Sequence, residues 1–195
     1  YNHPSIYIWG ILNECASDTA YGRECYKTQL ELIKSLDVTR PRSFSSCRFK
    51  TDICFDLVDV VSYNIYPKWY HNTPVAMYLD DLYKWVQTTG GAGKPFLITE
   101  VGAGAIYGYR TPAKVKWSEE YQVLALEEQL GAILSYKDCS GVYIWQICDV
   151  RVTNDWWNTR PRTMNNKGIV DEYRRPKLSY ETVKRIFGSV DTYRK

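Results

Sequence analysis

Short apolar segments alternate along this chain with longer stretches in which apolar residues recur at helical spacing. Five apolar segments, each bounded by polar or turn-forming residues, are typical of strands buried on both faces. They lie at residues 6–12, 42–47, 57–65, 95–99 and 142–148. Helices are predicted at residues 23–36, 74–88, 118–136 and 179–187. The alternation of the two patterns predicts βα units built on a parallel sheet.

Two of these helices have recognisable starting signals. Ser118 is a candidate N-cap, because a serine hydroxyl can accept a hydrogen bond from a backbone N–H of the first turn. Thr73 is a second candidate N-cap, and Pro74 would then occupy the first helical position. The pair Gly90-Gly91 is expected to stop the helix that Pro74 begins.

Five parallel strands fit either an open doubly wound sheet or part of a closed barrel. No glycine fingerprint for phosphate follows the first strand, whereas polar residues follow several strands in succession. Among these residues are Asn13 with Glu14, Asn64 with Tyr66, and Glu100. Chemistry at the carboxyl ends of successive strands is typical of a (β/α)8 or TIM barrel. The pattern therefore favours an α/β fold of the barrel type.

Composition adds little beyond a single globular domain. The chain of 195 residues is 45% hydrophobic, which is enough to bury a substantial core. Seven Trp and seventeen Tyr are typical of sites that stack on sugar faces, although aromatic residues also fill cores. A net charge of +3 produces no field that would favour nucleic acid or an acidic membrane as a partner.

Six cysteines occur at irregular spacings, without a CxxC pair and with only two His to help them bind a metal. We interpret them as reduced, mostly buried thiols of a cytoplasmic protein, and we expect no metal site and no organic cofactor. No apolar run approaches the length of a membrane span, and no signal segment opens the chain. Because the chain does not begin with Met, we expect its natural N-terminus to be missing.

Two carboxylates stand out, because each follows an otherwise apolar strand. Glu14 comes directly after the first strand, and Glu100 follows residues 96–99. Small residues at 101–104 are expected to leave room beside Glu100. A pair of carboxylates facing one cavity suits glycoside hydrolysis, in which one protonates the leaving oxygen and the other attacks the sugar or activates water. The alternative is that each glutamate starts a helix or forms a salt bridge.

The segments around both glutamates resemble glycoside hydrolase family 2, the family of β-galactosidases and β-glucuronidases. Residues 2–14, NHPSIYIWGILNE, are similar to its acid/base strand, and residues 96–103, FLITEVGA, to its nucleophile strand. The resemblance implies a retaining, double-displacement hydrolase with Glu14 as acid/base and Glu100 as nucleophile. In that family these residues follow barrel strands four and seven. Residues 1–195 would then be strands four to eight, with strands one to three and any N-terminal β-sandwich domains missing.

Within the family the chain looks most like the β-glucuronidases, which implies a β-glucuronide or a related uronide as the carbohydrate substrate. Residues 62–70 are similar to the loop after strand six, and residues 165–168 resemble an Asn-x-Lys motif that binds the sugar carboxylate. The resemblance implies that Asn13 contacts the 2-hydroxyl and that Trp145 lies beneath the sugar. The complete set of substrate-binding residues that it implies is Asn13, Asn64, Tyr66, Tyr70, Trp145, Asn165 and Lys167.

Some features leave alternatives open. Residues 160–164 depart from the family pattern, and because Arg160 or Arg162 could reach the same carboxylate, galacturonides also fit. Trp156 and Trp157 could form a platform for the aglycone or pack a loop. A hydrolase of neutral β-glycosides and a non-catalytic sugar-binding fragment remain rival hypotheses. Five barrel strands would leave two edges unpaired, so we expect the chain to need the rest of its barrel or an oligomeric partner.

Overall fold

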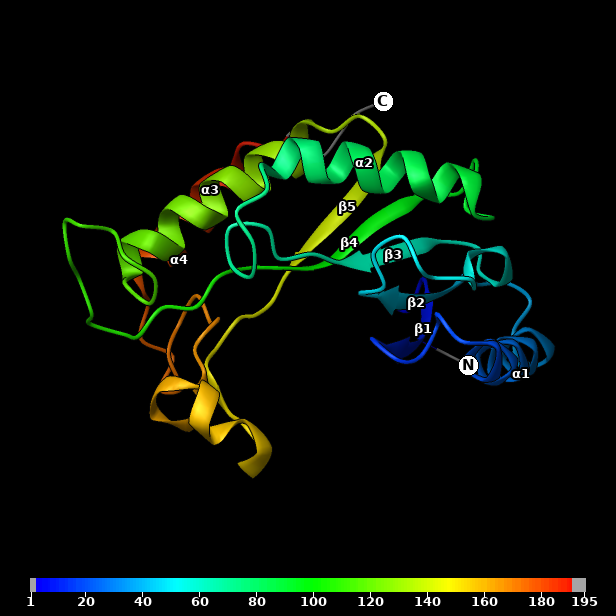
Figure 1. Cartoon of the computed structure of the whole chain (residues 1–195), viewed down its shortest axis with the longest axis horizontal. Coiled ribbons are helices and arrows are strands. Elements are labelled where there is room, and N and C mark those ends of the chain that lie inside the picture. Colours follow the sequence, from blue (N-terminus) through cyan, green and yellow to red (C-terminus); the bar gives the residue numbers. More distant parts are fainter. Residues whose placement is uncertain (1–2, 191–195) are drawn as a thin grey trace. The chain divides into compact units, whose positions relative to one another are not determined.

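The computed structural model of the protein describes residues 3–190, which form two compact units. Unit 1 contains the described residues up to Ile65, together with Ala76–Thr99 and Lys137–Gly141. Unit 2 contains the rest of the described chain. Figure 1 labels the α-helices and the strands of the larger sheet.

A five-stranded parallel sheet organises unit 1. Its strands are β1 (Trp9–Asn13), β2 (Arg42–Ser46), β3 (Val61–Asn64), β4 (Phe96–Val101) and β5 (Cys139–Ile144). The last residues of β4 and β5 belong to unit 2. The strands are ordered β1-β2-β3-β4-β5, so each is paired with its successor in the sequence. A doubly wound sheet reverses direction at a switch point, whereas a barrel does not, so this order favours the barrel interpretation.

The strand predicted at residues 57–65 is wrong in its first half. Residues Phe55–Leu57 form a short 3-10 helix, η1, and β3 begins only at Val61. The cause is a tertiary contact, because the Asp59 carboxylate accepts hydrogen bonds from the backbone N (2.9 Å) and the Nε (2.8 Å) of Arg42. The backbone N–H of Asp59 also donates to the carbonyl of Arg42. The chain before Val61 therefore bends around Arg42 and does not extend the ladder.

The helices of unit 1 lie close to their predicted positions. Helix α1 (Ala20–Leu36) begins three residues earlier than predicted, because the Thr19 side chain accepts a hydrogen bond from the backbone N of Gly22 at 3.0 Å. Helix α2 (Val75–Thr88) begins immediately after Pro74, one residue later than predicted. Buried aromatic side chains join α1 to the sheet, with the ring of Tyr26 edge-on to that of Phe44 at 4.5 Å.

Unit 2 is organised around a pair of helices, α3 (Glu119–Ser135) and α4 (Leu178–Gly188), which pack against one another (Figure 1). The predicted N-cap Ser118 is confirmed, since its hydroxyl accepts from the backbone N of Tyr121 at 3.2 Å. Buried polar groups connect the two helices. The Ser179 hydroxyl donates to Oε1 of Gln122 at 2.7 Å.

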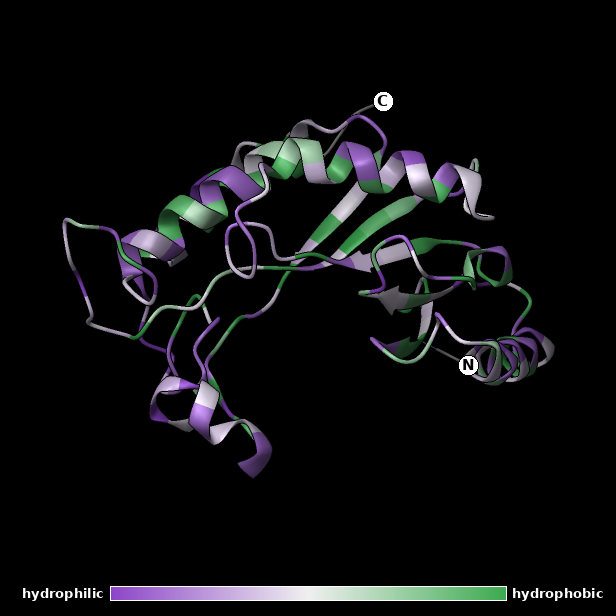
Figure 2. Ribbon diagram, in the orientation of Figure 1, coloured by the Kyte–Doolittle hydropathy of each residue, from purple (hydrophilic) through white to green (hydrophobic). Residues whose placement is uncertain are grey.

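A small antiparallel ribbon in unit 2 was not predicted. Strand β6 (Val150–Arg151) pairs with β7 (Met164–Asn165), and between them lie the 3-10 helices η2 (Asn154–Thr159) and η3 (Pro161–Thr163). Figure 2 shows the contrast between the largely hydrophobic β4 and β5 and the predominantly hydrophilic η2. A strand of two residues is too short to produce a period in the sequence.

Within residues 3–190, no helix is both long enough and apolar enough to cross a bilayer. The expectation that the cysteines are mostly buried is wrong, because Cys25, Cys139 and Cys148 are half-buried and Cys15 and Cys47 are exposed. Both exposed cysteines follow the carboxyl end of a strand, where the chain leaves the sheet. Of the six thiols, only Cys54 is fully buried.

Candidate active site

The Asn64 amide is the centre of a polar network at the carboxyl ends of three strands in unit 1. Its Nδ2 donates to Oδ1 of Asn13 and to Oε1 of Glu14, both at 2.9 Å. Its Oδ1 accepts from the hydroxyl of Thr99 at 2.8 Å. Both polar atoms of this buried amide are therefore satisfied, and Glu14 is oriented by a neutral donor.

The backbone at Glu14 is held in an unusual conformation. Its φ of 54° lies in the left-handed region, which non-glycine residues rarely adopt. The backbone N of Glu14 donates to the carbonyl of Ser45 at 2.9 Å, and the guanidinium of Arg48 donates to the carbonyl of Cys15 at 3.2 Å. Contacts from β2 and the loop after it thus fix the direction in which the chain leaves β1.

Glu100 lies within β4, directly after Thr99, and its partner is Tyr66. The phenol of Tyr66 donates to Oε2 of Glu100 at 2.5 Å. A charge-assisted O–H···O⁻ hydrogen bond of this length is among the stronger kinds found in proteins. Tyr66 follows β3 in the sequence, so a residue just after one strand orients a carboxylate near the end of the neighbouring strand.

Two of the small residues after Glu100 are glycines at which other groups already fill the place of a side chain. A Cβ on Gly102 would lie 2.4 Å from the carbonyl oxygen of Trp145. A Cβ on Gly104 would lie 2.7 Å from the ring of Trp117. These glycines allow close approach of the backbone and of aromatic rings, so their role is in packing.

Lys167 is a buried cation among aromatic rings. The residue is only 3% exposed, and its Nζ donates to the hydroxyl of Tyr70 at 3.0 Å. The Nζ also lies 5.0 Å from the ring centre of Tyr66, 5.1 Å from that of Tyr70 and 5.8 Å from that of Trp69. Within the described part of the chain, Tyr70 is its one hydrogen-bond acceptor. An ammonium has three donors, so two remain for a ligand.

The hydroxyl of Tyr70 is shared between two cations. It accepts from Lys167 and, at 3.3 Å, from the guanidinium of Arg160. Burial by itself would raise the pKa of Tyr70, but hydrogen bonds and positive charge from Lys167 and Arg160 outweigh it and lower that pKa. Burial in turn lowers the pKa of Lys167, and this is partly opposed by the bond to Tyr70. The cluster carries excess positive charge and suits an anion.

Asn165 and Trp145 differ in what they offer a ligand. The side-chain oxygen of Asn165 accepts from the backbone N of Lys167 at 3.3 Å, so Asn165 shapes the turn that presents Lys167. Trp145 is 38% exposed, and its backbone N donates to the carbonyl of Val101 at 2.9 Å. A cis peptide bond joins Trp145 to Gln146. The exposed part of the indole provides an apolar surface.

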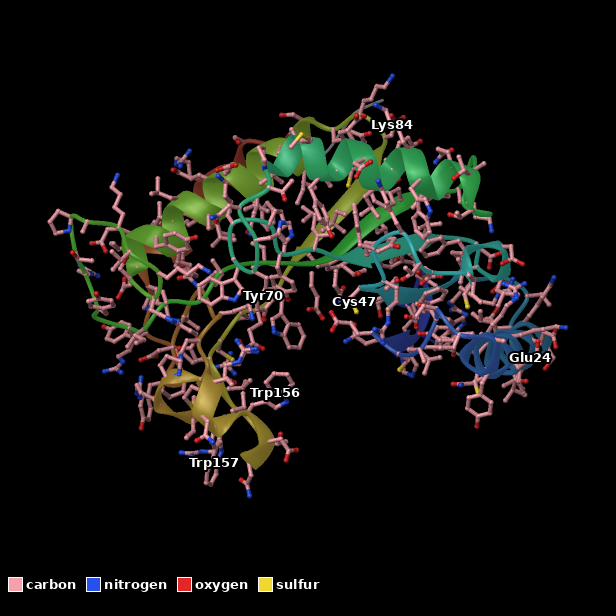
Figure 3. All side chains as sticks on the ribbon, in the orientation of Figure 1. Glu24, Cys47, Tyr70, Lys84, Trp156 and Trp157 are labelled. Carbon is pink, nitrogen blue, oxygen red and sulfur yellow. The ribbon has the colours of Figure 1, made fainter. Side chains whose placement is uncertain are left out.

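The other tryptophans of interest, Trp156 and Trp157, project from η2 (Figure 3) and are 54% and 45% exposed. The guanidinium of Arg160 lies 5.7 Å from the ring centre of Trp156.

The predicted residues thus fall into two groups. Asn13, Glu14 and Asn64 share a network in unit 1, and the predicted tyrosines, Glu100 and Lys167 are connected in unit 2. Sequence reasoning missed Thr99 and Trp69. A possible signal for Thr99 was a hydroxyl immediately before Glu100 at the end of a strand. A possible signal for Trp69 was its place inside the aromatic loop.

The chain is similar to known glycosidases in sequence and in fold. Over 91% of its length, the chain is 33% identical to β-glucuronidase from Rattus norvegicus. A structure of a GH2 β-galacturonidase from Eisenbergiella tayi bound to galacturonate is 74% identical over 99% of the chain, with a TM-score of 0.97. β-Glucuronidase from Ruminococcus gnavus, in complex with D-glucuronic acid, is 26% identical over 95% of the chain, with a TM-score of 0.83.

The match to these relatives covers only part of their length. The chain spans 28% of the rat protein, 35% of the Eisenbergiella tayi chain and 33% of the Ruminococcus gnavus chain. Residues 1–192 match the model of the family described as glycosyl hydrolases family 2, TIM barrel domain. The chain therefore belongs to glycosyl hydrolase family 2, as a TIM barrel domain sequence.

Proposed function

We propose that the full-length protein containing this chain is a retaining β-glycosidase that acts on uronides. The observation that supports the substrate class is Lys167, a buried ammonium whose one hydrogen-bond acceptor in the described part of the chain is Tyr70. In addition to the attraction of the Glu100 carboxylate, a sugar carboxylate would give this ammonium a charged hydrogen-bond acceptor. A neutral hexose would offer it only uncharged acceptors, and a buried charge is unfavourable unless it is well paired.

In the proposed mechanism Glu100 attacks the anomeric carbon while Glu14 protonates the departing oxygen. Water, deprotonated by Glu14, then hydrolyses the glycosyl-enzyme, and configuration is retained. The Asn64 amide donates to Oε1 of Glu14. No group within residues 3–190 hydrogen-bonds to the other oxygen, Oε2, which suits a role of Oε2 in proton transfer. The retaining mechanism requires the two carboxyl groups to be about 5 to 5.5 Å apart.

The remaining polar residues have roles that follow from their contacts. The Asn64 amide donates a hydrogen bond to Oδ1 of Asn13, which turns Nδ2 of Asn13 to the side from which it can donate to the sugar 2-hydroxyl. Tyr66 holds Glu100, and Tyr70 holds Lys167. The exposed surface of Trp145 suits the apolar face of a sugar ring.

We propose that a galacturonide is cleaved in preference to the glucuronide. The support is the 74% identity to the Eisenbergiella tayi β-galacturonidase, together with the second cation, Arg160, beside Tyr70. The β-glucuronidase relatives are more distant, at 33% and 26% identity. The rival hypotheses are a hydrolase of neutral β-glycosides and a sugar-binding protein without turnover.

We further propose that the chain supplies strands four to eight of the barrel and acts in the cytoplasm. Five strands in sequential order, within a chain that spans about a third of its structural relatives, support the strand assignment. Six thiols without a disulfide-like pattern favour a reducing compartment. Covering the open edges would require the rest of the barrel or an oligomeric partner. Residues 1–195 behaving alone as a cooperatively folded monomer would contradict that requirement.

The substrate class is tested with 4-nitrophenyl β-D-galacturonide, β-D-glucuronide and β-D-galactoside on the full-length protein. We expect the galacturonide to have the highest kcat/KM. Glu100→Gln should abolish turnover of every substrate, and Lys167→Ala should lower kcat/KM for uronides by about 10- to 100-fold, as for a lost charge-assisted hydrogen bond. Cleavage of the galactoside should change little.

Each rival predicts a different result. A neutral-sugar hydrolase would prefer the galactoside and would keep its discrimination in Lys167→Ala. A sugar-binding protein would bind glycosides without turnover. Activity retained in Glu100→Gln would exclude Glu100 as the nucleophile.

A further inference from the structure

A fully buried ion pair lies in unit 2, outside the set of residues expected to touch substrate. The Nζ of Lys177 is 2.8 Å from Oδ1 of Asp149, and both side chains have 0% exposure. Lys177 immediately precedes α4, and Asp149 lies between β5 and β6. The two residues are 28 positions apart, so their pairing is a tertiary contact.

The pair binds the backbone on both sides of Lys167. The Nζ of Lys177 donates to the carbonyl of Asn166 at 3.1 Å, and the backbone N of Gly168 donates to Oδ1 of Asp149 at 2.9 Å. Asn166 and Gly168 are the immediate neighbours of Lys167. A displacement of either member of the pair would therefore move the backbone from which the Lys167 side chain extends.

A second set of contacts makes this arrangement rigid. The Nζ of Lys177 also donates to the carbonyl of Ala105 at 2.6 Å, and the backbone N of Ala105 donates to the same Asn166 carbonyl at 2.8 Å. A Cβ on Gly168 would lie 2.3 Å from the backbone N of Asp149. The turn is thus held against its surroundings with no room for a side chain at position 168.

Such a buried ion pair is not expected to add much to the free energy of unfolding. Burial raises the pKa of Asp149 to about 6 and lowers the pKa of Lys177, and both shifts are reduced by the attraction between the two groups. Oδ2 of Asp149 is buried without a hydrogen-bond partner among the described residues. Replacing buried ion pairs by apolar residues is often neutral or stabilising, so the benefit of this pair lies in geometry.

We infer that Lys177 and Asp149 are positioning residues, which fix Lys167 for the carboxylate of a uronide substrate. The inference rests on the proposed function. Neither side chain contacts Tyr70, Tyr66 or Glu100 in the described structure, so both act through the backbone around Lys167. Binding sites require their groups to be held within about 0.5 Å of the productive position, which a turn fixed on both sides can achieve.

The test is a double-mutant cycle in the full-length protein. The pair variant combines Lys177→Met with Asp149→Asn, so that no unpaired charge is buried. It is made alone and together with Lys167→Ala, and kcat and KM are measured with uronide and galactoside chromogens. We expect the pair variant to lower uronide kcat/KM by about 10-fold or more, mostly through KM, because displacing a binding group by about 1 Å is costly.

The distinguishing result is non-additivity. In the Lys167→Ala background the pair variant should cause little further loss with the uronide, since the group that it positions is already absent. Equal losses with and without Lys167, or equal losses with uronide and galactoside, would show that the pair serves the fold in general and would overturn the inference. If Lys167→Ala has no effect on uronide cleavage, the proposed function fails first.

Two further variants keep the test informative. Arg185→Met with Glu127→Gln removes an exposed ion pair of 2.6 Å between α4 and α3, and should leave both substrates unaffected. Should the pair variant not fold, as judged by circular dichroism, Lys177→Gln with Asp149→Asn replaces it, because both side chains stay polar, the asparagine oxygen can still accept from Gly168, and no unpaired charge is buried. A partial loss confined to the uronide is expected there, and unchanged discrimination would overturn the inference.

Discussion

The hydroxyl of Tyr66 lies 2.5 Å from Oε2 of Glu100, although 34 positions separate the two residues. The parallel sheet brings them together, because β3 and β4 are neighbours and Tyr66 follows one strand while Glu100 lies near the end of the other. A donor held in this way both orients the carboxylate and stabilises its charge. In the proposed mechanism, this contact prepares Glu100 for attack.

Tyr66→Phe should therefore reduce catalysis without unfolding the protein. Removing one hydrogen bond to a charged group corresponds to about 1.5 to 3 kcal/mol, so kcat/KM for the uronide should fall by roughly 10- to 100-fold. Steady-state kinetics on the full-length protein measures this. The matched control is Tyr121→Phe, whose hydroxyl donates to the backbone carbonyl of Lys68. If both variants lose activity equally, the contact with Glu100 has no special role.

Asn64→Asp should be more damaging than its small change in size suggests. The new carboxylate would replace the Nδ2 donor that lies 2.9 Å from Oε1 of Glu14, so two like charges would face one another. We expect a loss of about 100-fold in kcat/KM at pH 7. Activity should recover partly at lower pH, where one of the two groups is protonated. The measurement is a pH profile of kcat/KM.

Thr99→Val is the companion variant. It removes the 2.8 Å hydrogen bond to Oδ1 of Asn64 but leaves the amide contact with Glu14 in place. A loss of about 10-fold or less is expected, as for one neutral hydrogen bond. A larger effect than that of Asn64→Asp would contradict the view that the amide orients Glu14.

The sequence predicted the sheet and the helices because their signals are local. Each strand is a short apolar run, and Ser118 has the side chain that its position at the start of a helix requires. Those apolar runs also predicted that Glu14, Asn64 and Glu100 lie at or near the carboxyl ends of strands. What failed was set by tertiary contacts, as where Arg42 bends the chain at Asp59 and shortens β3.

The site was predictable only in part, and for the same reason. Tyr70 and Lys167 are hydrogen-bonded although 97 positions separate them in the sequence, and neither composition nor periodicity indicates this contact. Their assignment to one site came from resemblance to a family. The burial of Asp149 and its pairing with Lys177 had no signal in the sequence, because a charged residue is usually found at the surface.

Substitution by alanine should change the free energy of unfolding in opposite directions at Gly131 and at Gly22. Both lie in helices, where alanine is favoured over glycine by about 0.8 to 1.0 kcal/mol. A Cβ on Gly131 meets nothing within 4 Å, so Gly131→Ala should stabilise the protein by about that amount. A Cβ on Gly22 would lie 1.8 Å from the carbonyl oxygen of Ala16, so Gly22→Ala should destabilise it. Urea denaturation measures the change in the free energy of unfolding for each variant. A change in the same direction for both would contradict the packing described for the two glycines.

Asp37 should make stability depend on pH in the acid range. Its pKa is held well below the ordinary 3.8, first by the side chain of Thr39 and then by Arg40, the backbone N of Thr39 and the indole of Trp9. A carboxyl with a lowered pKa in the folded state binds protons more readily when unfolded. Its contribution is therefore complete above about pH 4 to 5 and declines as the pH falls below the unfolded-state value.

Asp37→Asn removes this titration, and the difference from wild type is the measurement. Between pH 7 and pH 5 the free energy of unfolding of the variant should lie below that of wild type by a constant amount, because Asp37 is ionised in both folded and unfolded states there. Below pH 4 this difference should narrow steadily, because protonation of Asp37 in the unfolded chain lowers the free energy of unfolding of the wild type but not of the variant. Urea denaturation at several pH values follows the trend. A gap that stays constant down to pH 2 would mean that the hydrogen bonds of Asp37 do not depend on its charge.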